Sequence, residues 1–392
     1  MLAGKLMEVG GMSIRIVRLA DCLVGWMAGG LAHVIVVASA FFGALSGSAA
    51  ATTAAIGSTL IPEMKKRGYP ADFVAGIQAV AGALGVIIPP SITMIMYGVC
   101  SSTSIGKLFM AGIVPGIVLA LFLMVTIAYQ AKKRKISQMN TFTFKELGAA
   151  FLDAIPALLV PTIILGGIYG GIFTPTEAGA LSAVYGIFYY LILWIVNKRA
   201  LKIDFLTIAA ISGASPAVIG LFKEINLHNI VISMGGAIVN TVLVMFVVGA
   251  SGAFSWLLTS AGVSSLLGKA ISAIAGNKYI FLLVANLIFI FIGMFIESVA
   301  GILIVTPILL PIATSLGVDP VHFGIIMVVN LALGLTTPPV GENQYIAAAI
   351  AEIPFEEEVK ASIPFLIAGF AALAVITYVE PLSLWLPGIL GM

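Results

Sequence analysis

The chain has 392 residues, of which 60% are hydrophobic and only 9% are charged, and its mean hydropathy is +1.15. Soluble domains carry roughly 25% charged residues, so this composition excludes a water-soluble globular protein and predicts a lipid-embedded one. The net charge of +2 hides short basic runs at 65–67, 132–135 and 198–202. We interpret these runs as short loops between membrane spans, and basic loops of this kind mark the cytoplasmic side of a membrane protein. They are too short to predict nucleic-acid binding.

The residues that most often hold metals are few and scattered. Cys22 and Cys100 and the three histidines lie far apart in the sequence, which predicts neither a disulfide framework nor a metal site. The chain has no His-Glu-x-x-His or Gly-x-Ser-x-Gly motif and no plausible pair of aspartates within a span. An intramembrane hydrolase is therefore disfavoured, and we expect no enzymatic activity and no cofactor.

Apolar stretches long enough to enter or span a bilayer follow one another along the chain. In chain order they are 24–45, 49–62, 73–96, 108–131, 154–173, 178–196, 230–259, 279–296, 299–313, 321–352 and 362–388. Residues 12–28 interrupt apolar positions with Arg15, Arg18 and Asp21, which predicts a helix lying on the membrane interface. Residues 201–229 mix apolar and charged positions and are predicted to form interfacial or arm helices.

An internal repeat with an offset of 249 residues runs through the sequence. The matched pairs are Pro62 with Pro311, Gly68 with Gly317, Gly85 with Gly334, Pro89 with Pro338, Pro90 with Pro339, Pro115 with Pro364, and Tyr129 with Tyr378. A slip of one residue also matches Gly43 with Gly293 and Ser48 with Ser298. Proline is only 18 of the 392 residues, so this agreement predicts two copies of one structural unit.

The distribution of charge predicts that the two copies are inverted in the membrane. The turn after Pro62 carries Lys65, Lys66 and Arg67, whereas the turn after Pro311 has no cation. Basic residues favour the cytoplasmic side, so the two turns are predicted to face opposite compartments. The number of spans between the basic runs supports the same inversion.

Each copy contains an apolar span that is interrupted in its middle by Gly-x-x-x-Pro-Pro, at 85–90 and at 334–339. Proline removes a backbone donor and pushes the preceding residue out of the helical region. The freed carbonyl groups are hard oxygen ligands for a small cation, and the new helix N-terminus favours an anion. A simple proline kink is the alternative for either span alone, but matched breaks favour a functional site.

A second irregular feature precedes each break. Ser46-Gly47-Ser48 splits the first apolar stretch into two arms too short to span twice, which predicts a re-entrant hairpin. The second copy has Ile296-Glu297-Ser298 at the matching place. Small residues that pack helices together are the alternative for the first tip. Hairpin tips that meet broken helices would create two ion sites on either side of a central solute site.

Ionisable residues within apolar spans are candidate functional residues because their burial is costly. Glu177, Glu297 and Glu342 meet this criterion, although each could instead cap a helix or face water. For Glu177 the sequence Thr174–Glu177 also fits a capping box. Glu352 and Glu356–Glu358 are predicted to lie in an exposed loop without a functional role.

These features together resemble the large membrane subunit (DctM-like, M subunit) of tripartite ATP-independent periplasmic (TRAP) transporters over essentially the whole chain. The most specific segments are 39–48, 56–69, 173–178, 319–324 and 334–341. The resemblance implies an all-α polytopic fold with re-entrant hairpins, broken helices and an elevator motion. It also implies a sodium-coupled symporter in the bacterial inner membrane, to which a periplasmic binding protein (P type) delivers an organic acid anion. A small membrane subunit (Q type) would brace it.

The resemblance also assigns residues to the two predicted ion sites. One Na⁺ site would comprise Ser46, Gly47, Ser48, Gly85, Pro89 and Pro90. The other would comprise Ser298, Gly334, Thr336, Thr337 and Gly341. The solute would lie between them, near Ser91, Thr93, Asn343 and Glu342.

The resemblance divides the chain into four parts. Residues 1–33 and 132–260 would be scaffold and arm helices, and 34–131 and 261–392 would be the two transport repeats. Family members usually have a further hydrophobic segment before the motif Leu-Ala-Gly-Lys-Leu-Met, which here occupies residues 2–7. This chain is therefore expected to lack part of the scaffold. Glu297 replaces a common aspartate and Glu342 a common apolar residue. The change at Glu342 could alter solute preference or proton coupling.

Alternative functions stay open at this point. A carrier of the same architecture that needs no binding protein would share every feature of the sequence. A channel is also possible, although inverted repeats with paired hairpins favour alternating access.

Overall fold

A computed structural model of the chain describes residues 11–136, 143–200, 227–262 and 277–391. Every regular element within these ranges is an α-helix. Five of these helices are long and apolar enough to cross a membrane, or six if one bent pair counts as a single span. The protein is therefore an all-α polytopic membrane protein, as its composition predicts.

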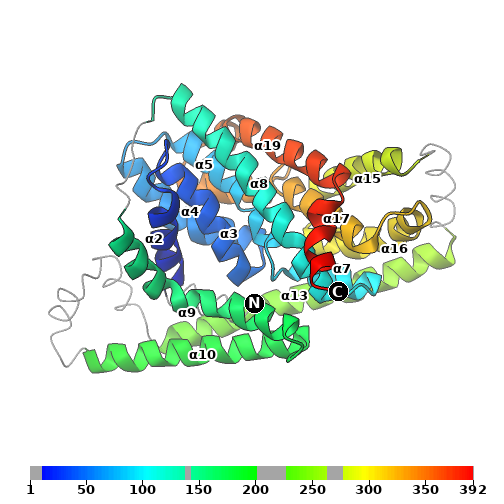
Figure 1. Ribbon diagram of the computed structural model, residues 1–392, viewed down its shortest axis with the longest axis horizontal. Helices are drawn as coiled ribbons and strands as arrows, with labels where there is room; N and C mark the ends of the chain where they lie inside the picture. The colour runs from blue at the N-terminus through cyan, green and yellow to red at the C-terminus, as the bar shows by residue number, and fades with distance from the viewer. Residues whose placement is uncertain (1–10, 137–142, 201–226, 263–276, 392) are drawn as a thin grey trace.

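The two copies of the repeat form two series of helices (Figure 1). In each series a helical hairpin is followed by an interrupted span and then by one long helix. The first series is α3 Leu31–Ser46, α4 Ala49–Lys66, α5 Ala71–Ala81, α6 Leu84–Ile87, α7 Ile92–Ser101 and α8 Ile105–Lys133. The second series is α15 Lys278–Gly293, α16 Ser298–Ser315, α17 Pro320–Gly334, α18 Glu342–Ala351 and α19 Phe355–Tyr378.

Corresponding helices of the two series begin and end at matching positions. The bounds of α4 and α16 differ by 249 residues at both ends, and those of α7 and α18 differ by 250. The turns after α4 and α16 both place a glycine at positive φ, Gly68 at 83° and Gly317 at 79°. Glycine adopts this conformation more readily than other residues. The internal repeat is thus confirmed in the helices, whereas its inversion in the membrane stays a prediction.

The two series interlock through the half-helices that follow the breaks. Helix α18 packs on α4 and α5 of the first copy, and α7 packs on α16 and α17 of the second. The hydroxyl of Tyr97 in α7 donates to the carbonyl oxygen of Pro320 at 2.6 Å. In the reciprocal contact, the Lys65 ammonium in α4 donates to the carbonyl oxygen of Ala351 at 2.7 Å. Each copy therefore completes the packing of the other.

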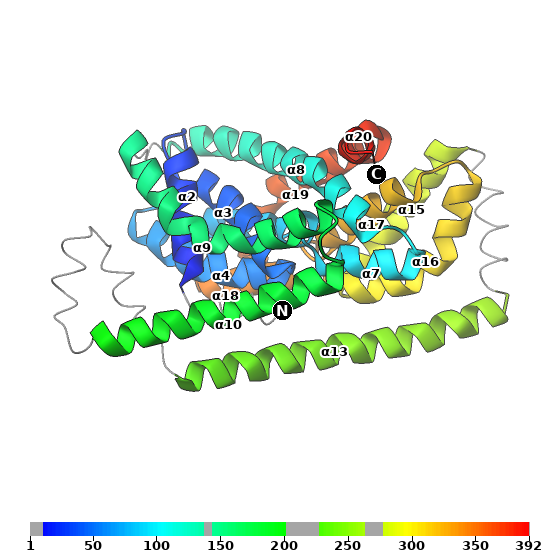
Figure 2. The same ribbon diagram turned by 60° about the horizontal axis from the view of Figure 1, so that its bottom comes forward.

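The remaining helices border this core. They are α2 Met12–Val24, α9 Phe144–Tyr169, α10 Pro175–Ala200, α13 Leu227–Ser260 and α20 Pro381–Ile389. Helices α10 and α13 are long rods that run along the bottom of the views (Figures 1 and 2). Helix α9 packs on α2 and α10, and α13 contacts α16.

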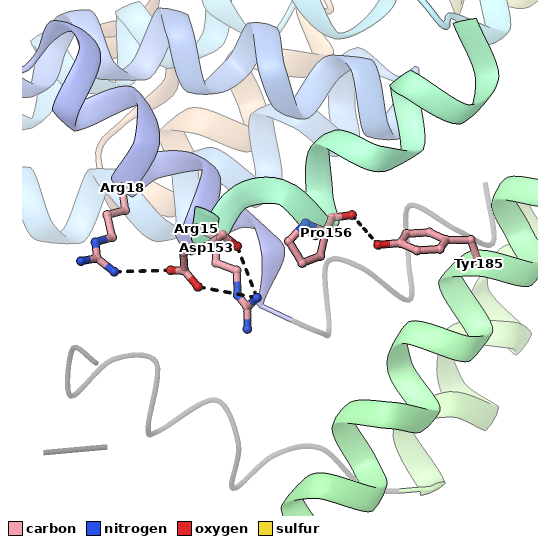
Figure 3. Close-up of polar contacts among 5 residues, drawn as sticks. All are labelled: Arg15, Arg18, Asp153, Pro156 and Tyr185. Atoms are coloured by element: carbon pink, nitrogen blue, oxygen red, sulfur yellow. Dashed lines mark hydrogen bonds and ion pairs between the residues drawn. The ribbon is translucent and has the colours of Figure 1, made fainter. Parts of the chain in front are cut away.

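Polar contacts join α2 to α9 and α9 to α10 (Figure 3). The Asp153 carboxylate in α9 lies 3.7 Å from Arg15 and 3.5 Å from Arg18 of α2. The Tyr185 hydroxyl in α10 donates to the carbonyl oxygen of Pro156 at 2.9 Å. One face of α2 is buried against its neighbours. Its predicted position on the membrane interface stays a prediction.

Two predicted spans differ from the helices. The stretch 24–45 is not one helix, because Gly29 and Gly30 have φ values of 103° and 48° and α3 begins only at Leu31. The stretch 362–388 divides into α19 and α20, which begins at Pro381. The predicted arm helices at 201–229 fall mostly outside the described residues, as does the motif that starts at Leu2.

Candidate functional site

The first hairpin has a tight polar tip. Helix α3 ends at Ser46, Gly47 has a φ of 62°, and Ser48 caps the start of α4 by accepting from the Ala51 amide at 3.4 Å. The hydroxyls of Ser46 and Thr52 lie 2.9 Å apart, and Thr52 donates to the Ser48 carbonyl oxygen at 2.8 Å. The predicted helical hairpin is therefore present in the structure.

The first interrupted span bends by 43° at its prolines. Ile88 is extended with a ψ of 124°, as expected before a proline, and the bond between Pro89 and Pro90 is cis. Helix α7 restarts with Ser91 as its cap, whose hydroxyl oxygen accepts from the Met94 amide at 3.3 Å.

The first tip and the first break lie against each other through glycines. A Cβ atom placed on Gly43 would lie 2.8 Å from the Gly85 Cα, which no real side chain tolerates. A Cβ atom on Gly85 would lie 2.5 Å from the Ser48 carbonyl oxygen, and one on Gly47 would lie 3.2 Å from the Pro90 carbonyl oxygen. The predicted first group of residues therefore meets at one junction, with backbone carbonyl oxygens in it.

The second tip is capped by a carboxylate. The Glu297 carboxylate accepts from the amides of Val299 at 2.9 Å and Ala300 at 3.4 Å, and so occupies the place of Ser48 at the start of the hairpin's second helix. Ser298 is fully buried, and its hydroxyl has no hydrogen-bond partner among the described residues.

The second break repeats the first with more hydroxyls. The hydroxyls of Thr336 and Thr337 both donate to the Leu333 carbonyl oxygen at 2.7 Å. The bond between Pro338 and Pro339 is cis, and Gly341 has a φ of 54° before α18. A Cβ atom on Gly334 would lie 2.6 Å from the Gly293 carbonyl carbon. The same close approach of hairpin and break therefore exists in both copies.

The predicted solute residues divide between the two half-helices that follow the breaks. Ser91 and Thr93 are buried near the start of α7, and the Thr93 hydroxyl has no partner among the described residues. Asn343 is buried in α18 and donates to the Ala79 carbonyl oxygen of α5 at 3.3 Å, with its side-chain oxygen unpaired there. Asn343 thus joins the second break to the first copy. Glu342 is half-buried beside it.

Two of the acidic candidates are helix caps. Glu177 accepts from the Thr174 amide at 2.8 Å and from the Thr174 hydroxyl at 2.9 Å, while Thr174 accepts from the Glu177 amide at 3.3 Å. These reciprocal bonds are the capping box that the sequence offered as an alternative. Glu297 is a cap in the same sense.

The expectation of an exposed loop at Glu356–Glu358 is wrong, because all three residues are helical and Glu358 is buried. All three residues form the first turn of α19, and Glu358 is fully buried while its two neighbours are exposed. The cause is helical geometry, since only the third glutamate of the run falls on the face that packs inward. Glu352 is exposed, as predicted, and lies 3.6 Å from Lys65.

Sequence reasoning missed Thr52 and Thr53 of α4. Thr52 bonds to the first tip, and both side chains are buried beside glycines of the first break, Gly85 and Gly82. Their position four and five residues after Ser48, in an alanine-rich helix, was the available signal. Thr52, four residues after Ser48, falls on the same helix face as the cap of the tip.

Two copies of a hairpin and a broken helix within a multi-pass bundle define a membrane transporter. The sequence matches the family described as "Tripartite ATP-independent periplasmic transporter, DctM component" over residues 1–382. The chain belongs to this family, and it is a transporter component and not an enzyme.

Similar proteins carry named solutes. The chain is 39% identical to the C4-dicarboxylate TRAP transporter large permease protein DctM of Pseudomonas aeruginosa, covering 100% of this chain and 85% of that one. It is 34% identical to the sialic acid TRAP transporter large permease protein SiaM of Vibrio cholerae, and the match covers 98% of this chain and 84% of that protein. It is 40% identical to the isethionate TRAP transporter permease protein DctMQ of Oleidesulfovibrio alaskensis, and the match covers 98% of this chain and 56% of that protein.

Proposed function

We propose that the chain is the large membrane subunit of a sodium-coupled, binding-protein-dependent symporter that imports an organic acid anion. The observation that carries the proposal is the matched close approach of hairpin and break, Gly43 to Gly85 and Gly293 to Gly334. Each approach gathers carbonyl or hydroxyl oxygens where a helix is interrupted. Such oxygens suit Na⁺, because hard cations prefer oxygen ligands and unwound segments coordinate coupling ions.

The proposed first Na⁺ site comprises the tip Ser46–Ser48 and the break around Gly85, Pro89 and Pro90. Polar atoms there already bond to one another, but a carbonyl oxygen has two lone pairs and can still accept a cation. The proposed second site comprises Ser298, whose buried hydroxyl is unpaired among the described residues, and the Thr336–Gly341 break.

The solute anion is proposed to bind between the two sites, because a helix begins after each break. The starts of α7 and α18 carry positive partial charge, and Ser91, Thr93, Asn343 and Glu342 lie in their first turns. The named relatives carry a C4-dicarboxylate, sialic acid or isethionate, all of which are organic anions. The same class of solute is proposed for this chain. The hairpins and broken helices would move together as an elevator within the bacterial inner membrane.

The proposed partners are a small membrane subunit and a periplasmic binding protein. A reconstitution tests them together with the coupling ion. Vesicles containing the two membrane subunits receive the binding protein loaded with labelled succinate, sialic acid or isethionate, under an inward gradient of Na⁺ or of K⁺. A tenfold Na⁺ gradient supplies about 1.4 kcal/mol per ion, enough to drive measurable accumulation. Accumulation is expected only with Na⁺ and the binding protein together.

The same vesicles distinguish the alternative function. Uptake that persists without the binding protein would favour a stand-alone ion-coupled carrier of the same architecture. Equal uptake under Na⁺ and K⁺ gradients would contradict sodium coupling, whichever partner is present.

A further inference from the structure

Gln344 has an unpaired oxygen atom at the second break. The residue is fully buried in the first turn of α18, and its side-chain oxygen Oε1 has no hydrogen-bond partner among the described residues. A Cβ atom on Gly341 would lie 2.3 Å from this oxygen, so the oxygen occupies space that any other residue at position 341 would fill. A buried polar atom without a partner is costly, which favours a ligand that binds there.

The hydrogen bonds of Ser362 in α19 settle which end of the Gln344 amide faces Gly341. The Ser362 hydroxyl donates its single proton to the Val359 carbonyl oxygen at 2.9 Å. Toward Gln344 this hydroxyl can therefore only accept, and the Gln344 Nε2 atom donates to it at 2.9 Å. The nitrogen of the amide thus faces α19 and the oxygen faces the break. Ser362 holds the amide in the orientation that presents an acceptor at Gly341.

The second break closes into a loop beside this oxygen. The backbone amide of Asn343 donates to the Leu335 carbonyl oxygen across the break at 3.2 Å. The loop between them, 336–342, contains the two threonines and Gly341 of the proposed second Na⁺ site. Gln344 therefore adds a side-chain oxygen to the loop that is proposed to hold the ion.

Capping of α18 is the alternative role for Gln344. A glutamine at the third position of a helix can accept from the backbone amide of the cap residue, which here is Gly341. The structure does not contain this bond, since the oxygen has no partner among the described residues. The two roles predict different results, because a cap affects stability alone, whereas an ion ligand changes the dependence on Na⁺.

The matching place in the first copy is apolar. An offset of 250 residues matches Gln344 with Met94 and Ser362 with Gly112. A Cβ atom on Gly112 would lie 2.4 Å from the Met94 Cε atom, so the corresponding helices touch at the same place in both copies. Packing of these helices therefore requires neither an amide nor a hydroxyl, which leaves the polar pair of the second copy for another role.

We infer that the Gln344 side-chain oxygen is a further ligand of the second Na⁺ site and that Ser362 positions it. The inference rests on the proposed sodium coupling, because it names one more ligand of an ion in the same transport cycle. Amide oxygens bind hard cations, whereas the matching Met94 side chain offers only a thioether. Through Gln344 and Ser362 the bound ion is linked to the long helix α19.

The test measures the thermal midpoint of the purified full chain as NaCl replaces choline chloride at constant ionic strength. Gln344→Met copies the first repeat and removes the oxygen, whereas Gln344→Glu keeps the shape and adds a negative charge. The Na⁺ concentration for half of the gain in stability is expected to rise about tenfold in Gln344→Met. It is expected to fall about threefold in Gln344→Glu, because cation affinity increases with the charge of the ligands.

Asn286→Val is the matched control. It removes another buried amide of the second copy and also copies the first repeat, which has Val37 at the matching position. This control is expected to change the midpoint but not the Na⁺ concentration for half of the gain. Ser362→Ala tests the positioning role. It is expected to raise that concentration about threefold in the wild-type background and to leave it unchanged in Gln344→Met, since Ser362 acts through Gln344.

Three outcomes would contradict the account in different ways. A wild-type Na⁺ concentration for half of the gain in both Gln344 variants would overturn the ligand, including the case in which water or the Gly341 amide pairs with the oxygen. An equal effect of Ser362→Ala in both backgrounds would overturn the positioning role. Wild type that gains no stability from Na⁺ would instead contradict sodium coupling itself.

Discussion

At the scale of single residues, four glycines decide how closely hairpin and break approach. Gly43 faces Gly85 in the first copy and Gly293 faces Gly334 in the second, and a Cβ atom on any of them would meet backbone at 3.0 Å or less. Backbone cannot move aside as a flexible side chain does. The junctions therefore depend on the absence of side chains, and the carbonyl oxygens proposed to bind Na⁺ depend on the junctions.

A substitution at Gly85 tests this dependence. In Gly85→Ala the new methyl group would lie 2.5 Å from the Ser48 carbonyl oxygen, so the tip must shift. We expect a loss of about 1–3 kcal/mol in stability, as for other overpacked positions, together with loss of Na⁺-driven uptake. Thermal denaturation of the purified chain and uptake in vesicles measure the two effects.

Gly148 provides the matched control. It lies in α9, and no atom of the described residues lies within 4 Å of its Cβ position. Gly148→Ala is expected to leave uptake unchanged and to stabilise the helix by up to about 1 kcal/mol. Equal behaviour of the two alanine variants would show that the close approach at Gly85 is unimportant.

At the scale of elements, the half-helix α18 belongs to the second copy but packs on the first. Its last carbonyl group, at Ala351, accepts from the Lys65 ammonium at 2.7 Å, and Glu352 lies 3.6 Å from the same ammonium. A cation at a helix C-terminus is favourable because the carbonyl groups there carry negative partial charge. The hydrogen bond from Lys65 thus links the C-terminal end of α18 to the hairpin helix α4.

The two partners of Lys65 are predicted to differ in importance. Lys65→Met should cost about 1 kcal/mol, because a charged donor to the helix end is lost. Glu352→Gln should change stability by less than about 0.5 kcal/mol, since the Glu352 side chain is 83% exposed and water competes for the pair. Chemical denaturation of both variants in the same detergent checks the order. A larger loss in Glu352→Gln would mean that the ion pair, and not the helix end, holds α18.

The interruptions of the helices could be predicted from the sequence, because proline and glycine change the backbone conformation at their own positions. The proline pairs and glycines predicted both breaks, and Ser46-Gly47-Ser48 predicted the first hairpin tip. The packing of α18 on α4 and α5 could not be predicted, since it joins residues nearly 300 positions apart. Glu358 was misassigned for the same reason. A run of three glutamates resembles a solvated turn until a partner helix covers one of them.

At the scale of the whole molecule, the two copies share a backbone plan but differ in polar groups. The first tip has the serine cap of Ser48 and buried threonines nearby, whereas the second has the carboxylate cap of Glu297 and two threonine hydroxyls at its break. The second copy also has the buried carboxyl group of Glu358, where the first copy has the buried side chain of Leu108. The repeat locates the proposed ion sites, and the differences between copies are expected to set the ion affinity of each.

The central claim is that both junctions bind the ions that drive transport. It is tested most directly by the Na⁺ dependence of solute uptake in vesicles for wild type, Ser48→Ala and Thr337→Ala. Each substitution removes one hydroxyl from one junction and leaves the other junction intact. Each variant is expected to need about tenfold more Na⁺ for half-maximal uptake. Unchanged Na⁺ activation in both variants would contradict the placement of the ion sites.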